Sequence, residues 1–221
     1  MPQAVIFDVD GTLVDSNDLH ASCWVDTFRE FGLDVPFDRV RGQIGKGGDQ
    51  LLPAVLDPSV IEEHGEAMED LRSELFMRDY LERVQPFPGV KPLFEKVRSD
   101  GLLIVLASSG RKAEVDHHIE LLDIGKLIEA ATTSDDAESS KPEPDIFEAA
   151  LKRIPTVSAA EAIVVGDTPY DVIAAGKAGL QTIGLLCGGF PERDLRDAGC
   201  IAIFGSPEQL LERYELSPLR K

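Results

Sequence analysis

From residue 86 onward, short apolar runs alternate with amphipathic segments, and this alternation constrains the fold more than any other feature of the chain. Strands that alternate with helices pair in parallel and need helices on both faces of their sheet. The pattern therefore predicts a doubly wound, Rossmann-like α/β fold, with its site beyond the carboxyl ends of the strands. The predicted strands are residues 4–7, 102–107, 127–131, 161–165, 180–186 and 201–204, and the predicted helices are residues 111–122, 146–154 and 169–177.

Residues 15–85 interrupt this alternation, because they contain helical patterns and no convincing strand. One helix is predicted to begin after Asp15 or Ser16 and to end at Gly32, and a second runs over residues 59–81. We interpret the segment as an all-helical cap domain inserted after the first strand. The predicted division is an α/β core of residues 1–14 and 86–221, with a helical cap of residues 15–85.

The composition restricts the partners of the protein. With 221 residues, 43% of them hydrophobic, the chain is typical of globular proteins, and no apolar run approaches membrane-spanning length. A net charge of −18 argues against nucleic acid and against membrane surfaces as partners. The three cysteines form no CxxC pair, so we expect reduced thiols in a cytoplasmic protein and no zinc site.

Polar groups follow the ends of several predicted strands. In "VIFDVDGT", Asp8 and Asp10 directly follow a buried strand, where two like charges are costly unless they are compensated. Because the carboxyl ends of parallel strands meet at one edge, we expect the other strand-end groups to lie beside this pair. They are Ser108, Ser109 and Gly110 in "LASSG", Lys141 in "SSKPEP", and Asp167 and Asp171 in "VVGDTPYD".

Four carboxylates at one edge cannot all stay ionised without compensation. A hard divalent cation provides it, and Mg²⁺ suits a site that also holds phosphate. Lys141 would add positive charge, and the hydroxyls and free amides of residues 108–110 can hold an anion. Simpler interpretations stay open for single residues: Asp171 as the acidic partner of a helix cap at Thr168, the two serines as helix caps, and Lys141 as a solvated charge.

Taken together, "DVDGT", "SS", "KP" and "GDTPYD" resemble the haloacid dehalogenase superfamily across essentially the whole chain. The nearest subgroup is similar to phosphoglycolate phosphatases and β-phosphoglucomutases, and the helical insert looks like the first type of cap in that family. The resemblance implies a phosphoric monoester hydrolase that acts on a small phosphorylated metabolite through an aspartyl-phosphate. Asp10 favours phosphate esters over organic halides, since an alkoxide needs a proton to leave and a halide does not.

The resemblance also implies a role for each strand-end residue. Asp8 would be the nucleophile, and Asp10 the acid that protonates the leaving oxygen and then the base that activates water. Asp171 would lie either in contact with the metal or just behind its ligands. The implied metal ligands are Asp8, the main-chain carbonyl of Asp10, Asp167 and Asp171, and the implied phosphate contacts are Thr12, Ser108, Ser109, Gly110 and Lys141.

Within the cap, His20 and Lys46 are candidate substrate contacts. Lys46 lies in the glycine-rich loop "QIGKGGDQL", which also fits an ordinary interhelical loop, and His20 also fits a packed histidine. His20 resembles a cap histidine of the mutases, so a β-phosphoglucomutase-like activity is the alternative to a phosphatase. The same loop has glycine where those mutases are expected to carry a basic residue, which favours hydrolysis.

A receiver-like phospho-switch is a remote alternative, since receiver domains also combine a phosphorylated Asp, Mg²⁺, a hydroxyl and a lysine. Their phosphorylated residue follows the third strand, however, and they carry no large helical insert. We expect a monomer or a weak homodimer. The identity of the phosphorylated metabolite stays open.

Overall fold

A computed structural model describes residues 1–220, in which six parallel strands form one sheet in the order β5-β4-β1-β6-β7-β8. The predicted doubly wound α/β fold is confirmed. At the centre, β1 pairs with β4 and β6, with Val5 opposite Ile104 and Ile163. The strands are β1 (Ala4–Phe7), β4 (Leu103–Ala107), β5 (Ala130–Thr132), β6 (Ala162–Gly166), β7 (Gln181–Leu185) and β8 (Ala202–Phe204).

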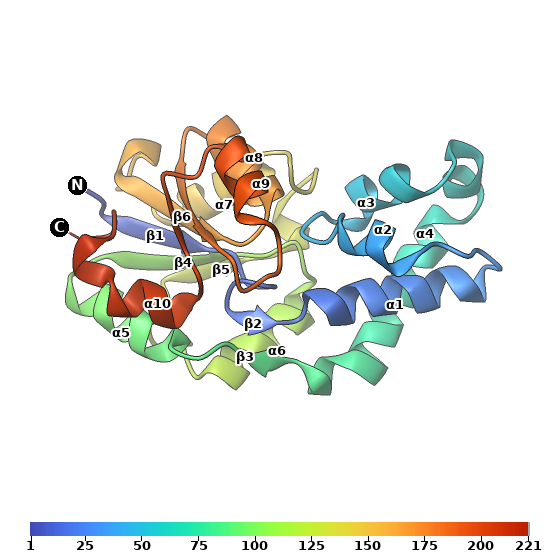
Figure 1. Ribbon diagram of the computed structural model, residues 1–221, viewed down its shortest axis with the longest axis horizontal. Coiled ribbons are helices and arrows are strands. Elements are labelled where there is room, and N and C mark those ends of the chain that lie inside the picture. The colour runs from blue at the N-terminus through green and yellow to red at the C-terminus, as the bar shows by residue number, and fades with distance from the viewer. Residues whose placement is uncertain (221) are drawn as a thin grey trace.

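Helices cover both faces of the sheet (Figure 1). Successive side chains of β1 point to opposite faces, as the pleat requires. Phe7 stacks on Phe94 with ring centroids 4.6 Å apart, whereas Ile6 packs on the other side with Phe147. One face carries α5 (Val90–Ser99), α6 (Lys112–Leu122) and α10 (Pro207–Glu212), and the other α7 (Asp145–Arg153), α8 (Pro169–Lys177) and α9 (Glu192–Ala198).

The helical insert between β1 and β4 lies beyond the carboxyl end of the sheet (Figure 1). Its helices bury their own apolar cluster, which includes Trp24, Phe28 and Met68. The two predicted helices are present, and the division into residues 15–85 and the remainder stays a prediction. The insert consists of α1 (Asn17–Glu30), α2 (Phe37–Arg41), α3 (Gly48–Val55) and α4 (Pro58–Leu75), followed by a π-helical turn (Phe76–Tyr80) and a 3₁₀ turn (Leu81–Arg83).

Two details differ from the sequence-based expectation. The linkers of the insert pair with each other, because β2 (Val14–Asp15) runs antiparallel to β3 (Gln85–Pro86), where no strand was expected. Strands of two residues are too short to show any alternation. The strand expected over residues 127–131 begins only at Ala130, since the preceding leucine and isoleucine pack against the core from a turn. Among residues 1–220, no helix is both long and apolar enough to cross a membrane.

Candidate active site

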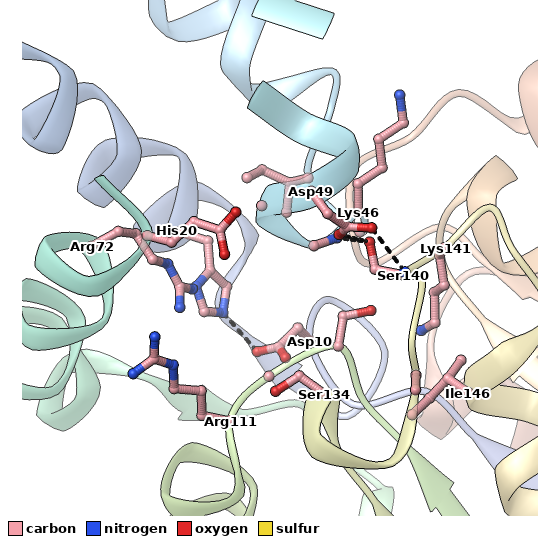
Figure 2. Close-up of a pocket in the computed structure, with 18 of the residues that line it drawn as sticks. Asp10, His20, Lys46, Asp49, Arg72, Arg111, Ser134, Ser140, Lys141 and Ile146 are labelled. Atoms are coloured by element: carbon pink, nitrogen blue, oxygen red, sulfur yellow. Dashed lines mark hydrogen bonds and ion pairs between the residues drawn. The ribbon is translucent and has the colours of Figure 1, made fainter. Parts of the chain in front are cut away.

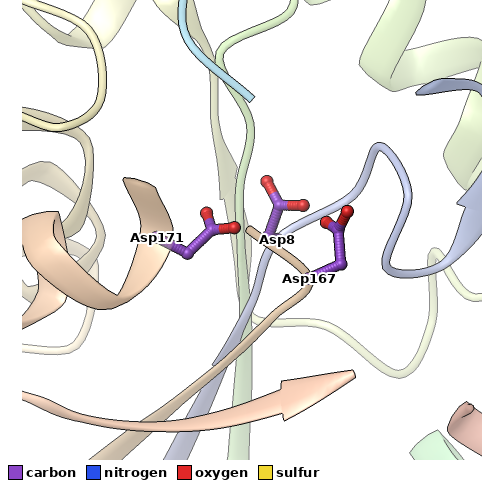
Figure 3. Close-up of side chains that lie close together, drawn as sticks. All are labelled: Asp8, Asp167 and Asp171. Carbon is purple, nitrogen blue, oxygen red and sulfur yellow. The ribbon is translucent and has the colours of Figure 1, made fainter. Parts of the chain in front are cut away.

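Three aspartates from separate places in the sequence meet at the carboxyl edge of the sheet (Figure 3). Asp8 follows β1, Asp167 follows β6, and Asp171 lies in the first turn of α8. All three are buried, and each offers an oxygen within 4.8 Å of the others. The Thr12 hydroxyl lies 2.9 Å from both Asp8 and Asp167. The structure therefore brings together three of the four predicted acids.

The turn after β1 depends on glycine. Gly11 has φ +76°, and a Cβ atom there would lie 2.1 Å from Asn17 Nδ2 and 2.4 Å from Asp167 Oδ2. This close approach lets the Asn17 amide donate hydrogen bonds of 2.8 Å to Asp167 and 3.0 Å to the Gly188 carbonyl. The first residue of α1 in the cap thus helps to orient an acid of the core.

Lys141 is the cation of this acidic group. Its Nζ lies 2.5 Å from Asp8 Oδ1 and 2.8 Å from Asp171 Oδ1, and the side chain is 1% exposed, so Lys141 is not a solvated charge. Burial alone would lower the pKa of Lys141, but Asp171 and Asp8 outweigh that effect and raise it. The lysine therefore stays protonated beside Asp8.

Charge balance makes this group a candidate metal centre. Burial raises the pKa of Asp8, and the charge of Lys141 lowers it by less. The net result is a pKa of about 7. Burial and the repulsion from Asp8 and Asp171 also raise the pKa of Asp167. Three carboxylates face one ammonium group, so a hard cation with oxygen ligands fits the donor set.

Asp171 has two roles in the structure. Its Oδ2 accepts hydrogen bonds from the Thr168 amide (3.0 Å) and hydroxyl (2.7 Å), and this capping box begins α8 together with Pro169. Its Oδ1 forms the ion pair with Lys141. The helix-cap interpretation is therefore correct and compatible with a place in the site.

The carboxylate of Asp10 lies outside the triad and points toward the cap (Figure 2). Its Oδ1 accepts a hydrogen bond of 2.7 Å from Ser16 and lies 2.8 Å from His20 Nε2. Ser16 precedes α1 but makes no capping bond to it. Burial would raise the pKa of Asp10, but His20, His118 and Ser16 outweigh that effect and lower it. Asp10 is thus held as a carboxylate between core and cap.

The predicted anion-binding turn follows β4. The buried Ser108 hydroxyl accepts a hydrogen bond of 3.0 Å from the Gly110 amide and lies 3.4 Å from Asp10. The Ser109 hydroxyl is buried without a hydrogen-bond partner among the described residues. Neither serine caps α6, since Arg111 occupies the position before that helix. The Ser109 hydroxyl is therefore available to a ligand, whereas the Ser108 hydroxyl is held by the Gly110 amide and Asp10.

A buried polar cluster connects the cap to the core behind Asp10. Arg72 of α4 donates to Glu114 of α6 at 3.0 Å and lies 2.5 Å from His20 Nδ1. The Glu114 side chain is 2% exposed, and the His20 ring stacks on Phe76 with centroids 4.1 Å apart. His20 is therefore both packed and polar: Arg72 fixes its ring, and the ring contacts Asp10.

We expect Arg72→Met to lower the free energy of unfolding by about 3 kcal/mol, because the substitution leaves the Glu114 carboxylate buried without its partner. The double variant Arg72→Met/Glu114→Leu should regain most of that loss. Arg78→Met is the matched control, since Arg78 pairs with Asp79 in solvent and should be neutral. Urea denaturation measures all three, and a double variant as unstable as the single one would contradict the explanation.

A cavity of about 290 Å³ lies between cap and core, over Asp8 and Asp10 (Figure 2). The glycine-rich cap loop lines it, but the amine of Lys46 points away from Asp10. That amine donates a hydrogen bond of 2.7 Å to Gln43 and lies 4.6 Å from the Tyr170 ring centroid. A direct contact between Lys46 and substrate remains a prediction.

Sequence reasoning missed several residues of this site, among them Asn17, Glu69 and Arg72. Asn17 is a helix-start residue, and the other two lie in the charged helix α4, where most side chains are solvated. Only the docking of the cap places Glu69 and Arg72 on the cavity. No spacing or periodicity within α4 distinguishes them from its exposed charges.

Comparison with known proteins agrees with this geometry. A family model described as haloacid dehalogenase-like hydrolase matches residues 5–185. The Arabidopsis thaliana protein SUPPRESSOR OF QUENCHING 1, chloroplastic, is 34% identical over 203 residues, which are 89% of this chain and 19% of that protein. The chain thus spans about a fifth of that relative. A phosphorylated carbohydrates phosphatase of Thermotoga maritima is 28% identical over 95% of this chain and 96% of its own.

Solved structures give the same result. A hydrolase from Pseudomonas syringae superposes with a TM-score of 0.87 at 27% identity, covering 96% of this chain and 98% of its own. A proposed β-phosphoglucomutase from Thermotoga maritima superposes with a TM-score of 0.67 at 26% identity, and the match covers 98% of this chain and 99% of its own. A proposed phosphoglycolate phosphatase from Lactobacillus plantarum superposes with a TM-score of 0.79 at 20% identity, and the match covers 96% of this chain and 99% of its own. The predicted resemblance to the haloacid dehalogenase family is confirmed, and structures named for both predicted subgroups share the fold.

Proposed function

The chain belongs to the haloacid dehalogenase-like hydrolase family, and on that premise we propose that it is a Mg²⁺-dependent phosphatase of a small phosphorylated metabolite. The observation that carries the proposal is the pairing of buried Asp8 with Lys141 on the core side of a cavity that Asp10 also lines. The activity in the name of the Thermotoga maritima relative, a phosphatase of phosphorylated carbohydrates, supports the same substrate class.

In the proposed reaction, Asp8 attacks phosphorus, and its new bond to phosphorus forms as the bond to the leaving oxygen breaks. Lys141 orients Asp8, and the Ser109 hydroxyl and the Gly110 backbone are placed to contact the phosphoryl oxygens. Mg²⁺ held by Asp8 and Asp167, with Asp171 beside them, would neutralise the charge on the phosphoryl group. Water then attacks the aspartyl-phosphate, and phosphate leaves.

Asp10 would move the protons in both steps. It gives a proton to the leaving oxygen and takes one from the attacking water. The free site holds Asp10 as a carboxylate through His20 and Ser16, which suits the second role. A phosphate dianion entering beside Asp10 would raise its pKa by repulsion between like charges, which suits the first.

We favour hydrolysis over the mutase alternative. A mutase must hold the second phosphate of a bisphosphate, which calls for a cap cation aimed into the site. The amine of Lys46 is turned toward Gln43 instead. His20 does not separate the alternatives, since its partner Asp10 would serve both reactions. The receiver interpretation has less support, because the candidate nucleophile follows β1 and a helical insert comes next.

We also propose the location of the enzyme and its assembly state. The three cysteines are free, which supports reduced thiols and the cytoplasm as its location. We keep a monomer or a weak homodimer as the proposed assembly. The acidic chain, with a net charge of −18, supports neither nucleic acid nor an anionic membrane as a partner.

The test is phosphate release from a panel of phosphorylated metabolites and from p-nitrophenyl phosphate. With Mg²⁺ we expect release from both, and after EDTA treatment we expect release to fall at least about a hundredfold and to return when Mg²⁺ is added. Turnover undiminished by EDTA would contradict the metal assignment. Conversion of β-glucose 1-phosphate to its 6-phosphate, faster than any phosphate release, would instead establish the mutase.

A further inference from the structure

On its cap side, the cavity is lined by an acidic side chain that has no hydrogen-bond or ion-pair partner among the described residues. Glu69 of α4 lines the cavity and is half-buried. Within residues 1–220, no hydrogen bond or ion pair reaches its carboxylate. Burial first, and the charge of Asp49 next, raise the pKa of Glu69. A half-buried acceptor that faces a substrate cavity is available to donors on the substrate.

The cations around the cavity, in contrast, already have partners. Lys141 pairs with two aspartates of the triad, and Arg72 with Glu114 and His20. Arg111 pairs with Asp70 at 2.9 Å. The amine of Lys46 is turned to Gln43. Lys46 is the one cation among these four without an acidic partner, and its amine points away from Asp10. A bisphosphate would need a free cation aimed into the site for its second phosphate.

Gly48, at the start of α3, explains how the carboxylate fits. A Cβ atom at Gly48 would lie 2.6 Å from the carboxyl carbon of Glu69 and 2.7 Å from its Oε1. Any side chain at this position would therefore displace Glu69. Position 48 therefore carries no side chain and so no cation, and the Glu69 carboxylate of α4 occupies the space beside it.

We propose that Glu69 accepts hydrogen bonds from hydroxyl groups of the leaving group, so that the enzyme selects monophosphates of sugars or sugar alcohols and disfavours bisphosphates. The inference rests on the proposed phosphatase function and identifies its substrate class. Charges of both signs act on the Glu69 carboxylate, since Asp49 and Asp70 oppose Arg111 and Arg72; we therefore infer a neutral hydroxyl donor rather than an ammonium group. A neutral hydroxyl is repelled by neither set of charges, whereas a second phosphate placed against Glu69 would be repelled by its carboxylate.

The test compares kcat/KM for glucose 1-phosphate, glucose 1,6-bisphosphate, phosphoethanolamine and p-nitrophenyl phosphate. The wild-type enzyme should prefer the monophosphate to the bisphosphate. In Glu69→Gln, kcat/KM for glucose 1-phosphate relative to p-nitrophenyl phosphate should fall about tenfold, as expected when a hydrogen bond to a charged acceptor is weakened. The ratio of kcat/KM for glucose 1-phosphate to kcat/KM for glucose 1,6-bisphosphate should also fall in Glu69→Gln. Glu66→Gln, an exposed change on the same helix, is the matched control and should alter neither ratio.

Three results would overturn the inference: unchanged ratios in Glu69→Gln, an equal loss on all four substrates, or a selective loss on phosphoethanolamine. The last would identify an ammonium group as the donor. Each leaves the phosphatase function standing, because p-nitrophenyl phosphate reports it separately. A wild-type enzyme that releases phosphate from none of the four would instead contradict the proposed function, and the inference with it.

Discussion

Asp8→Asn is expected to lower kcat for phosphate release at least about a thousandfold, because an amide cannot form the aspartyl-phosphate. The substitution keeps the size of the side chain, and Lys141 retains Asp171 as its partner. The loss should therefore appear in kcat rather than in folding. Steady-state kinetics with p-nitrophenyl phosphate and Mg²⁺ measure it. A variant that keeps a tenth or so of wild-type turnover would rule out Asp8 as the nucleophile.

The stability of the same variant provides a control. The folded protein holds the pKa of Asp8 at about 7, above the ordinary value of 3.8, so an ionised Asp8 destabilises the metal-free fold once the pH exceeds the ordinary value. In EDTA, Asp8→Asn should melt at the same or a higher temperature than the wild type at pH 7. The difference should shrink as the pH falls and vanish only well below the ordinary value of 3.8, where Asp8 is protonated in both states. A large drop in melting temperature would assign the activity loss to misfolding.

The parts of the site that sequence reasoning predicted share a physical cause. Asp8, Lys141 and Asp167 each follow a strand, and parallel strands bring their carboxyl ends to one edge. The bounds of α8 were also predictable, since Thr168 and Pro169 mark its start by their own chemistry. Local signals and sheet topology were sufficient for this half of the site.

The remaining half depends on how the cap docks on the core. Glu69 and Arg72 lie on the same helix as many solvated charges, and only tertiary packing distinguishes them. The pairing of β2 with β3 escaped prediction for a similar reason, because each strand contributes two residues. The direction of the Lys46 amine depends on Gln43 and Tyr170, and the latter is distant in sequence. Contacts of this kind leave no periodic pattern.

The contacts around Asp10 join these two halves. Asp10 belongs to the core, but the hydrogen bond from Ser16 and the contact with His20 come from the linker and the first helix of the cap. Arg72 and Glu114 support His20 from behind. Correct placement of Asp10 therefore requires a docked cap, so proton transfer would be coupled to the cap closing over substrate.

Asp10→Asn is expected to separate the two chemical steps. p-Nitrophenolate leaves without a proton, so Asp8 should still be phosphorylated at a useful rate, whereas water attack still requires a base, which the amide of the variant cannot provide. With p-nitrophenyl phosphate we expect a burst of one p-nitrophenol per enzyme, followed by steady-state turnover about 10²–10⁴-fold below the wild type. An alkyl phosphate, whose leaving oxygen needs a proton, should give no burst.

Rapid-mixing absorbance measures the burst, and intact-protein mass spectrometry should find one phosphoryl group on the enzyme afterwards. Asp8→Asn is the matched control, because it lacks the nucleophile and should show neither burst nor added mass. A variant without a burst whose steady-state rate is also low would place Asp10 in the first step even for an activated leaving group. A steady-state rate within about threefold of the wild type would remove Asp10 from proton transfer, since general acid–base groups contribute far more than that.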